Sequence, residues 1–485
     1  MKVIGFSPDL DPTTDGVLTD CSAVLPSLRG IEGAPAPVSA IVPALSAACQ
    51  GSASMITLAG NSRTFAATAN KIYEAAVGSW NDVTYTAVGN YTTVTGRWRF
   101  AQFGSVSLAT SLQNTAQASP SALFSKISGA PKADIIETVN QFVICANVVT
   151  TSFGTDPNRW FCSALGDYTN WTPSIATQCA SGLLVSVPDR ITALRRFGDN
   201  VIAYKALGMY FGTYTGPPFI WSFTEVPSSS GTFCQESVLN IGTPDQPRHF
   251  FVGMDNFYTF DGGRPLPVGW EVKDYFLSRL NRAAASSICM MRDQLKSRVY
   301  IYYPSGSATT PNDCLVYNYR TGKWGQDPRT VEFALEYLPA GITYDQLGTY
   351  YNTYADFPNA SYDTAFWQSA SPAPAIFDSS HQLNTLTGSP GPSYFVTADV
   401  GDEGTMLLLD RVKPQWIRMP ATATMTNYYR TQALGEPLVQ DQTVNPVNDR
   451  FDVMRTARWH RFKFSQQGPW ELNTVLPSLR PDGLE

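Results

Sequence analysis

The chain of 485 residues is long enough to bury a large core in one main domain with one or two smaller ones. Aromatic residues make up 12% and charged residues only 15%, alongside 36 Gly and 34 Pro. This is typical of many short strands and tight turns rather than long surface helices. The net charge of −6 argues against the basic face of a nucleic-acid-binding protein.

Residues 1–60 are predicted to form an extended N-terminal segment, because Pro and Gly recur through them. The start of the chain lacks the apolar region of a signal peptide, and no apolar run approaches the roughly 18 residues of a membrane-spanning helix. Asp9, Asp11 and Asp15 weakly resemble a calcium loop. Thr13 occupies its third acidic position, so we predict no metal site.

Residues 61–394 carry a repeated pattern in which an apolar strand is followed by a turn, a Tyr/Phe-rich strand and a closing tryptophan. The pattern recurs at intervals of about 50 residues, which is typical of β-propeller blades. Six candidate units are found, at residues 63–80, 98–110, 142–171, 201–221, 249–270 and 298–324. The sequence therefore predicts an all-β protein with a β-propeller of about six blades.

Four tryptophans are predicted to be buried at equivalent positions in their blades, because each follows a Tyr/Phe-rich strand: Trp80, Trp171, Trp221 and Trp324. Asp167 and Tyr258 are two further structural blade positions. The stretch around Asp167 loosely resembles the Asp-box turn of sialidase-type propellers, but its glycine precedes the aspartate. A turn in which Asp167 caps backbone N–H groups is the favoured interpretation.

The last third of the chain departs from the repeat. A helix is predicted over residues 272–280, because their apolar positions share one helical face. Residues 331–394, rich in Pro, Ser, Tyr and Thr, are predicted to be a long, irregular excursion within the propeller or a poorly repeating blade. From residue 395 to residue 485, alternating polar and apolar positions predict a separate, small antiparallel β domain.

Residues with catalytic chemistry are scattered. The three histidines, His249, His381 and His460, share no metal-ligand spacing, and no nucleophile, zinc or phosphate-loop motif is present. The eight cysteines form no C-x-x-C pair and several lie in apolar strands, so we expect buried, reduced thiols. We predict a protein that is not an enzyme and that binds no cofactor.

A basic cluster near the C-terminus is a candidate interface: Arg455, Arg458, Arg461 and Lys463. Interleaved aromatic residues allow either nucleic-acid or protein contact. Strand alternation predicts that Arg458 points with His460, while Arg461 and Lys463 point with Trp459. Because the charge is then divided between two faces, we favour a solvated strand or a protein–protein contact.

The order of several stretches along the chain resembles the tail hub, or nozzle, proteins of short-tailed bacteriophages, the packaged-DNA stabilisation protein family. The matching stretches are residues 16–35, 44–83, 98–104, 160–178, 251–263 and 458–472. Asn256 departs from the family, which has glycine in this turn, but asparagine tolerates a left-handed backbone.

The resemblance implies a β-propeller with an added β platform, assembled as a ring, typically a hexamer, beneath a tail adaptor. It implies further contacts with tail fibre, spike, needle or plug proteins, and passage of double-stranded DNA without tight binding. The location would be the virion tail, after assembly in the host cytoplasm. Two other classes remain open: a glycan-degrading propeller and a lectin-like propeller, each acting on the host surface.

Overall fold

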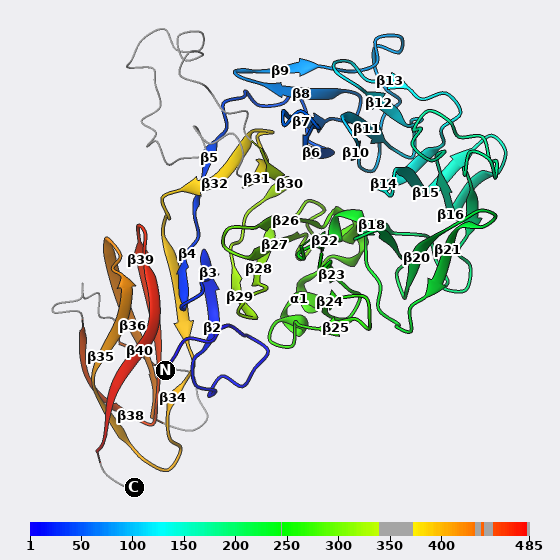
Figure 1. Ribbon diagram of the computed structural model, residues 1–485. Helices are drawn as coiled ribbons and strands as arrows, with labels where there is room; N and C mark the ends of the chain where they lie inside the picture. The colour runs from blue at the N-terminus through cyan, green and yellow to red at the C-terminus, as the bar shows by residue number, and fades with distance from the viewer. Residues whose placement is uncertain (244, 339–371, 432–437, 441–449, 483–485) are drawn as a thin grey trace.

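The computed structural model describes residues 1–243, 245–338, 372–431, 438–440 and 450–482 (Figure 1). Across these ranges the regular secondary structure is almost entirely β strand, as the composition predicts. Among them, only α1 (Lys273–Arg279), η1 (Gln235–Ser237) and η2 (Arg282–Ser287) are helical. The helix α1 lies within the predicted range 272–280. It buries Phe276 against Phe257, with ring centroids 4.8 Å apart.

The larger part of the chain is a propeller whose antiparallel blades have four strands each. Blade 1 contains β6 (Gly51–Ile56), β7 (Ser62–Ala67), β8 (Ile72–Ala76) and β9 (Ser79–Asp82). Blade 2 contains β10 (Arg99–Phe103), β11 (Val106–Thr110), β12 (Gln117–Ser119) and β13 (Ser125–Lys126). Blade 3 contains β14 (Lys132–Val139), β15 (Phe142–Thr150), β16 (Gly154–Cys162) and β17 (Ser181–Leu183).

The remaining blades follow in chain order. Blade 4 contains β18 (Ala193–Phe197), β19 (Asn200–Tyr204), β20 (Met209–Gly216) and β21 (Ile220–Glu225). Blade 5 contains β22 (Val238–Asn240), β23 (His249–Val252), β24 (Phe257–Phe260) and β25 (Leu266–Pro267). Blade 6 contains β26 (Cys289–Asp293), β27 (Arg298–Tyr303), β28 (Asp313–Asn318) and β29 (Lys323–Gln326). Blade 7 contains β30 (Val331–Tyr337), β31 (Ala373–Asp378), β32 (Leu383–Gly388) and β5 (Ala36–Ser39).

The blades close into a ring. The innermost strands contact one another in the order β6, β10, β14, β18, β22, β26 and β30, and β30 contacts β6 again. Blade 7 is completed by β5, which arrives from the N-terminal segment and pairs antiparallel with β32, Pro37 opposite Leu386. The backbone hydrogen bonds of β5 therefore tie the start of the chain to the last blade.

The structure refines the predicted domain division in two places. The six predicted units overlap blades 1–6, and β30, β31 and β32, from the stretch predicted to be an excursion or a poorly repeating blade, form three strands of a seventh blade. Residues 1–60, predicted to be merely extended, contain β1–β5 and the first strand of blade 1. The repeat was hidden because the fourth strand of blade 7 lies some 300 residues away in sequence, in residues 36–39.

The platform is a sandwich of two sheets, at the lower left of Figure 1. One sheet contains β1 (Gly5–Phe6), β2 (Val17–Ser22), β33 (Ser393–Thr397), β34 (Val400–Gly401), β36 (Thr422–Arg430), β37 (Leu438–Gln440) and β39 (Trp459–Gln467). The facing sheet contains β3 (Val24–Pro26), β4 (Ile31–Gly33), β35 (Leu407–Arg418), β38 (Phe451–Ala457) and β40 (Glu471–Pro481). Phe451 and Phe464 meet between the sheets, with ring centroids 5.7 Å apart. The platform predicted for residues 395–485 is therefore present, but it also uses the N-terminal strands.

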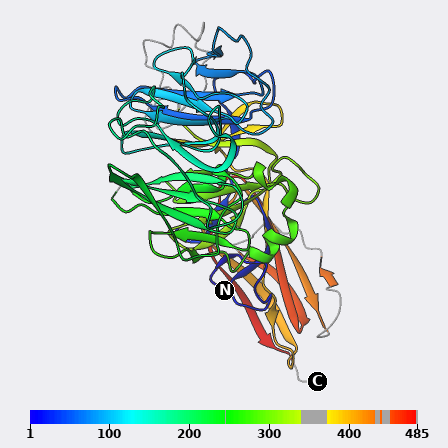
Figure 2. The ribbon, with the colours of Figure 1, turned by 90° about the vertical axis from the view of Figure 1, so that its right-hand side faces the viewer.

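The platform and the propeller share one sheet and one hydrophobic core. Strand β3 pairs with β29 of blade 6, and β4 pairs with β40, so blade 6 continues into the platform. Trp324 of blade 6 and Phe464 of the platform belong to the same buried cluster. Figure 2 shows the platform strands extending below the blades. This continuity of sheet and core makes the two parts one body.

Three of the four tryptophans that were predicted to share a position in their blades do so. Trp80, Trp221 and Trp324 are each the second residue of the outermost strand of their blade. Each packs against a phenylalanine of the preceding blade, with ring centroids 4.8–6.1 Å apart: Phe377, Phe142 and Phe257, respectively. Trp221 and Trp324 are buried, whereas Trp80 is half-buried. These tryptophans fill the same gap between neighbouring blades.

Trp171 does not share this position. It is buried in the loop between β16 and β17, where it packs against Phe161 of its own blade, with ring centroids 5.4 Å apart. Its indole Nε1 donates to the Tyr168 carbonyl oxygen at 2.9 Å. The loop is longer than the turns that precede the other three tryptophans, so equal spacing in sequence does not give an equal position in space.

Candidate functional site

Charged side chains from the innermost strands and from η1 form ion pairs between blades inside the ring. Arg99 of β10 forms a fork with Glu236 of η1, with Nε–Oε1 and Nη2–Oε2 distances of 2.9 and 3.1 Å. Its Nη1 also donates to Asp134 of β14. Because Glu236 immediately precedes blade 5, on the far side of the ring from blade 2, this pair spans the axis.

Further ion pairs join the innermost strands of neighbouring blades. Arg195 of β18 lies 3.8 Å from Glu137 of β14, and Arg292 of β26 lies 3.4 Å from Glu336 of β30. Burial raises the pKa of Glu137, whereas for Glu236 the effect of burial is outweighed by Arg99, and the pKa falls below its ordinary value. These carboxylates are occupied by blade-to-blade contacts, so we assign them a structural role.

Of the two predicted blade positions, Asp167 lies in a turn, whereas Tyr258 lies in β24, directly after the turn that contains Asp255 and Asn256. Thr169 donates its backbone N–H and its hydroxyl to Asp167 Oδ1 at 2.8 and 2.6 Å, which lowers the pKa of Asp167. The Tyr258 hydroxyl donates to the Asp255 carboxylate at 3.0 Å. Asn256 serves this turn through its side chain, since Oδ1 accepts from the Phe257 N–H at 2.8 Å, and its backbone is not left-handed.

Two members of the predicted basic cluster, Arg461 and Lys463, lie on the outer face of the platform sheet that contains β39, whereas Arg455 lies in β38 of the facing sheet. Along β39, His460 and Phe462 point into the core, whereas Trp459, Arg461 and Lys463 are half-buried on the opposite face. The predicted orientation is therefore right for Arg461 and Lys463. Arg458 precedes the strand at a bend and is half-buried, so the alternation of β39 does not extend to it.

Two members of the cluster lie over aromatic rings. On the outer face, the Lys463 ammonium lies 4.2 Å from the ring centroid of Tyr394. The Arg455 guanidinium lies 4.8 Å from the ring centroid of Tyr429, but this pair is on the inner side, because Tyr429 lies opposite the inward-pointing His460 and Arg455 belongs to the facing sheet. Arginine and aromatic side chains are enriched in the central contacts of protein interfaces. The outer face formed by β36, β39 and β33 therefore has the composition of an interface.

A small pocket opens on this face and brings Arg461 together with residues that the sequence did not indicate. It is lined by Asp399, Tyr428, Arg430, Trp459 and Arg461. Strand register places Tyr428 opposite Arg461 and Arg430 opposite Trp459, so aromatic and basic side chains alternate in a square. We refer to these five residues as the arginine pocket. Tyr428 and Arg430 could have been found as outward positions of the predicted strand, but their partner strand could not.

At the base of the arginine pocket, one carboxylate holds both arginines. Arg461 donates Nε and Nη2 to Asp399 at 2.7 and 2.9 Å, and Arg430 donates Nη2 to Asp399 Oδ2. The Asp399 side chain is only 4% exposed, whereas those of Arg430 and Arg461 are 25% and 32% exposed. The pocket therefore carries two positive charges and one negative charge, and its guanidinium groups face solvent.

His249 and the cysteines serve packing, whereas His381 is partly exposed and pairs with Glu332. In the described part of the chain, no group of three or more His, Cys, Asp or Glu side chains could hold a metal ion. All eight cysteines are free and buried, as predicted. His249 is fully enclosed: its Nε2 lies 2.9 Å from the Arg196 carbonyl oxygen, and its Nδ1 lies 2.8 Å from the Tyr204 hydroxyl. Because a carbonyl can only accept, Nε2 carries the proton and Nδ1 accepts from Tyr204.

His249 predicts a pH dependence of stability. Burial lowers its pKa from 6.5 to about 4, so below pH 6.5 the unfolded chain binds a proton that the folded chain does not. The free energy of unfolding of the natural chain is therefore expected to fall by about 3 kcal/mol between pH 6.5 and pH 4, relative to His249→Gln. Urea unfolding of both proteins across this range checks it. Parallel pH profiles would contradict the assignment.

The fold and the site together define a β-propeller protein with a fused β-sandwich platform. No protein-family model matches the chain, and no curated protein matches it. Solved structures of similar fold include "YCF48 bound to D1 peptide", at 12% identity and a TM-score of 0.34, covering 63% of this chain and 87% of that one. The structure of YCF48 from Cyanidioschyzon merolae has 12% sequence identity and a TM-score of 0.36, and the match covers 61% of this chain and 88% of that one. Both are similar in fold alone, and no functional argument rests on them. Among the described helices, none has the length and apolar character needed to cross a membrane.

Proposed function

We propose that this chain is a structural, non-enzymatic subunit of a short bacteriophage tail hub. In this proposal a ring of copies, six as in the resembling family, retains packaged DNA and then forms the channel for its ejection. The proposal is supported by the ordered resemblance to nozzle proteins along the sequence. The observation that supports it most is the platform, because a β-propeller with an added β platform is the architecture that this resemblance implies.

The ion pairs inside the ring bear on where a DNA channel would lie. Arg99 and Glu236 form a buried pair between blade 2 and the start of blade 5, so charged side chains of the subunit itself occupy the inside of the propeller. The DNA channel of the proposed hub therefore lies between subunits, around the axis of the assembled ring. The outer face of the platform sheet, with Arg461 and Lys463, is the surface we assign to neighbouring subunits or to the tail adaptor.

The net charge of the subunit supports a channel that lets DNA pass and does not retain the DNA by binding it. Each phosphate that a basic group neutralises adds a salt-dependent contribution to binding, and a basic wall would grip duplex DNA along its length. The subunit carries a net charge of −6. We therefore propose a channel lined by acidic and neutral polar groups, with retention left to a constriction or to plug and needle proteins. Such a subunit is assembled in the host cytoplasm and remains in the virion tail.

Filter binding of duplex DNA to the assembled protein at low salt tests this function. Screening is weakest under these conditions, so any attraction is easiest to detect, and we expect no tight binding. Tight, salt-sensitive binding that is abolished by Arg458→Ala and Arg461→Ala would contradict the proposal. Release of sugar from host capsule or lipopolysaccharide would instead favour a glycan-degrading propeller, and binding of intact glycan by a monomer would favour a lectin.

A further inference from the structure

The arginine pocket has one more positive charge than negative charge, in a setting that is partly removed from water. Asp399 is almost fully buried and is bound by both guanidinium groups. Partly desolvated charges are costly unless they are paired. A second anion placed over Arg430 and Arg461 would balance the pocket, whereas a cation would be repelled.

The geometry also leaves donors for such an anion. In the hydrogen bonds of the described residues, Arg430 uses only Nη2 and Arg461 uses Nε and Nη2. Among the described residues, Nη1 of both arginines and Nε of Arg430 have no hydrogen-bond partner, and these are the donors that we assign to a ligand. A guanidinium presents its N–H groups in a planar fork that matches a carboxylate. Tyr428 and Trp459 stand beside the arginines and limit the space around the bound group.

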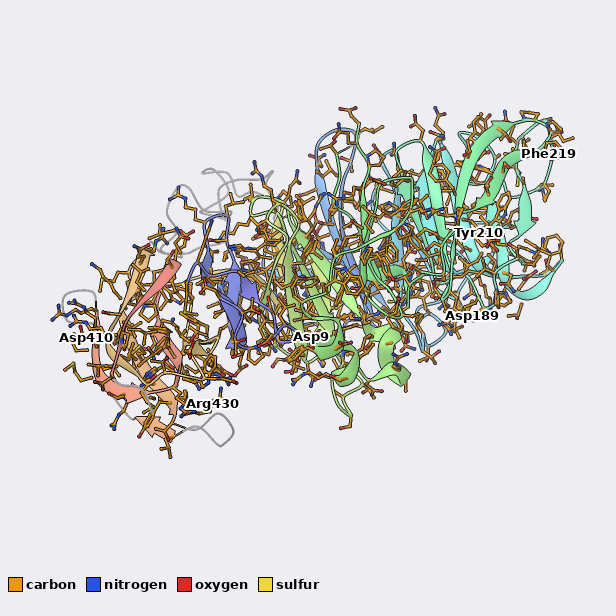
Figure 3. All side chains as sticks on the ribbon, turned by 90° about the horizontal axis from the view of Figure 1, so that it is seen from below. Asp9, Asp189, Tyr210, Phe219, Asp410 and Arg430 are labelled. Carbon is orange, nitrogen blue, oxygen red and sulfur yellow. The ribbon has the colours of Figure 1, made fainter. Side chains whose placement is uncertain are left out.

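We propose that the arginine pocket binds a carboxylate side chain from an acidic peptide segment of a partner protein. The occupant follows from charge complementarity with Arg430 and Arg461, and from the aromatic and arginine composition of the face around the pocket. Figure 3 shows Arg430 on the platform, far from the labelled propeller residues Tyr210 and Phe219, so the pocket would connect the platform to its neighbour. A DNA phosphate is disfavoured because the chain is acidic overall.

This inference deepens the proposed function, because it names the chemistry of one partner surface of the hub subunit. The inference about peptide binding and the proposed function can also fail independently of each other. A ring can form through other surfaces while the pocket binds nothing, and the pocket can bind an acidic peptide in a protein that never forms a ring. The experiment therefore measures peptide binding by the full chain and not assembly.

The probe is a fluorescent nine-residue peptide of alternating Glu and Ser with blocked ends, titrated by anisotropy at low salt. A matched peptide with Gln in place of Glu controls for charge, and a short duplex DNA and inorganic phosphate serve as competitors. We expect the Glu peptide to bind and the Gln peptide not to bind. Binding of both peptides alike, of neither peptide, or displacement by DNA at lower concentration than by free Glu peptide would overturn the proposal.

Two variants locate the binding. Arg430→Gln leaves the Arg461–Asp399 fork in place, so it should fold, and we expect at least a tenfold loss of peptide affinity. Arg480→Gln is the control, because Arg480 is also on the platform, is 66% exposed and pairs with Asp410 rather than with Asp399. It should change affinity less than twofold. If Arg430→Gln does not fold, Arg430→Lys keeps a positive charge without the fork, and at least a fivefold loss is expected. Unchanged affinity in the folded Arg430 variant would overturn the pocket as the site.

Discussion

Replacing Arg99 by Ala is expected to lower the free energy of unfolding by about 3–5 kcal/mol, because it leaves Glu236 buried without its counter-charge. Arg99 and Glu236 are each only 8% exposed, and Asp134 loses a partner at the same time. The substitution also breaks a contact that spans the ring from blade 2 to the start of blade 5. Urea unfolding at pH 7 measures the loss.

Two comparisons make the Arg99 prediction specific. Arg196→Ala, which removes an exposed arginine of β18, is expected to change stability by less than 0.5 kcal/mol. The Glu236 pKa is depressed, so its stabilising contribution is present at neutral pH and is lost as the pH falls through its ordinary value of 4.5 and below. The difference between Arg99→Ala and the natural chain should therefore shrink in acid. If Arg99→Ala and the natural chain have equal free energies of unfolding at pH 7, the Arg99–Glu236 pair does not stabilise the propeller.

Trp221→Ala is expected to cost about 3–5 kcal/mol through loss of buried contacts between blades 3 and 4. Trp221 is 3% exposed, and its ring centroid lies 5.7 Å from that of Phe142 in the preceding blade. Trp270→Ala is the matched control, because Trp270 is 57% exposed, and it should cost less than about 1 kcal/mol. Thermal or urea unfolding of both variants gives the comparison. Similar costs would show that Trp221 does not support the contact between blades.

The periodic part of the fold could be predicted from sequence because each blade repeats a local pattern. Trp80, Trp221 and Trp324 marked the same strand position, and each followed a short turn that fixed it. Blade 7 could not be predicted in the same way, because its strand β5 comes from residues 36–39 while its other strands follow residue 330. Pairing over such a separation leaves no local pattern in the sequence.

Only the part of the candidate site that depends on local sequence could be predicted. Alternation along one strand placed Arg461 and Lys463 on the outer face correctly, since that depends only on neighbouring residues. The pocket itself depends on the register of β36 against β39 and on the short link that carries Asp399. The axial pair of Arg99 and Glu236 joins residues from opposite blades. Neither arrangement has a signature within a single stretch of the chain.

The central proposal is that copies of this chain form a ring with a passage for DNA, and imaging of the purified protein together with its mass in solution tests it most directly. The proposal predicts particles whose mass is several times the 53.1 kDa of one chain, six times for a hexamer, with an open centre around the ring axis. Particles that remain single subunits of 53.1 kDa at every concentration and salt tested would contradict it.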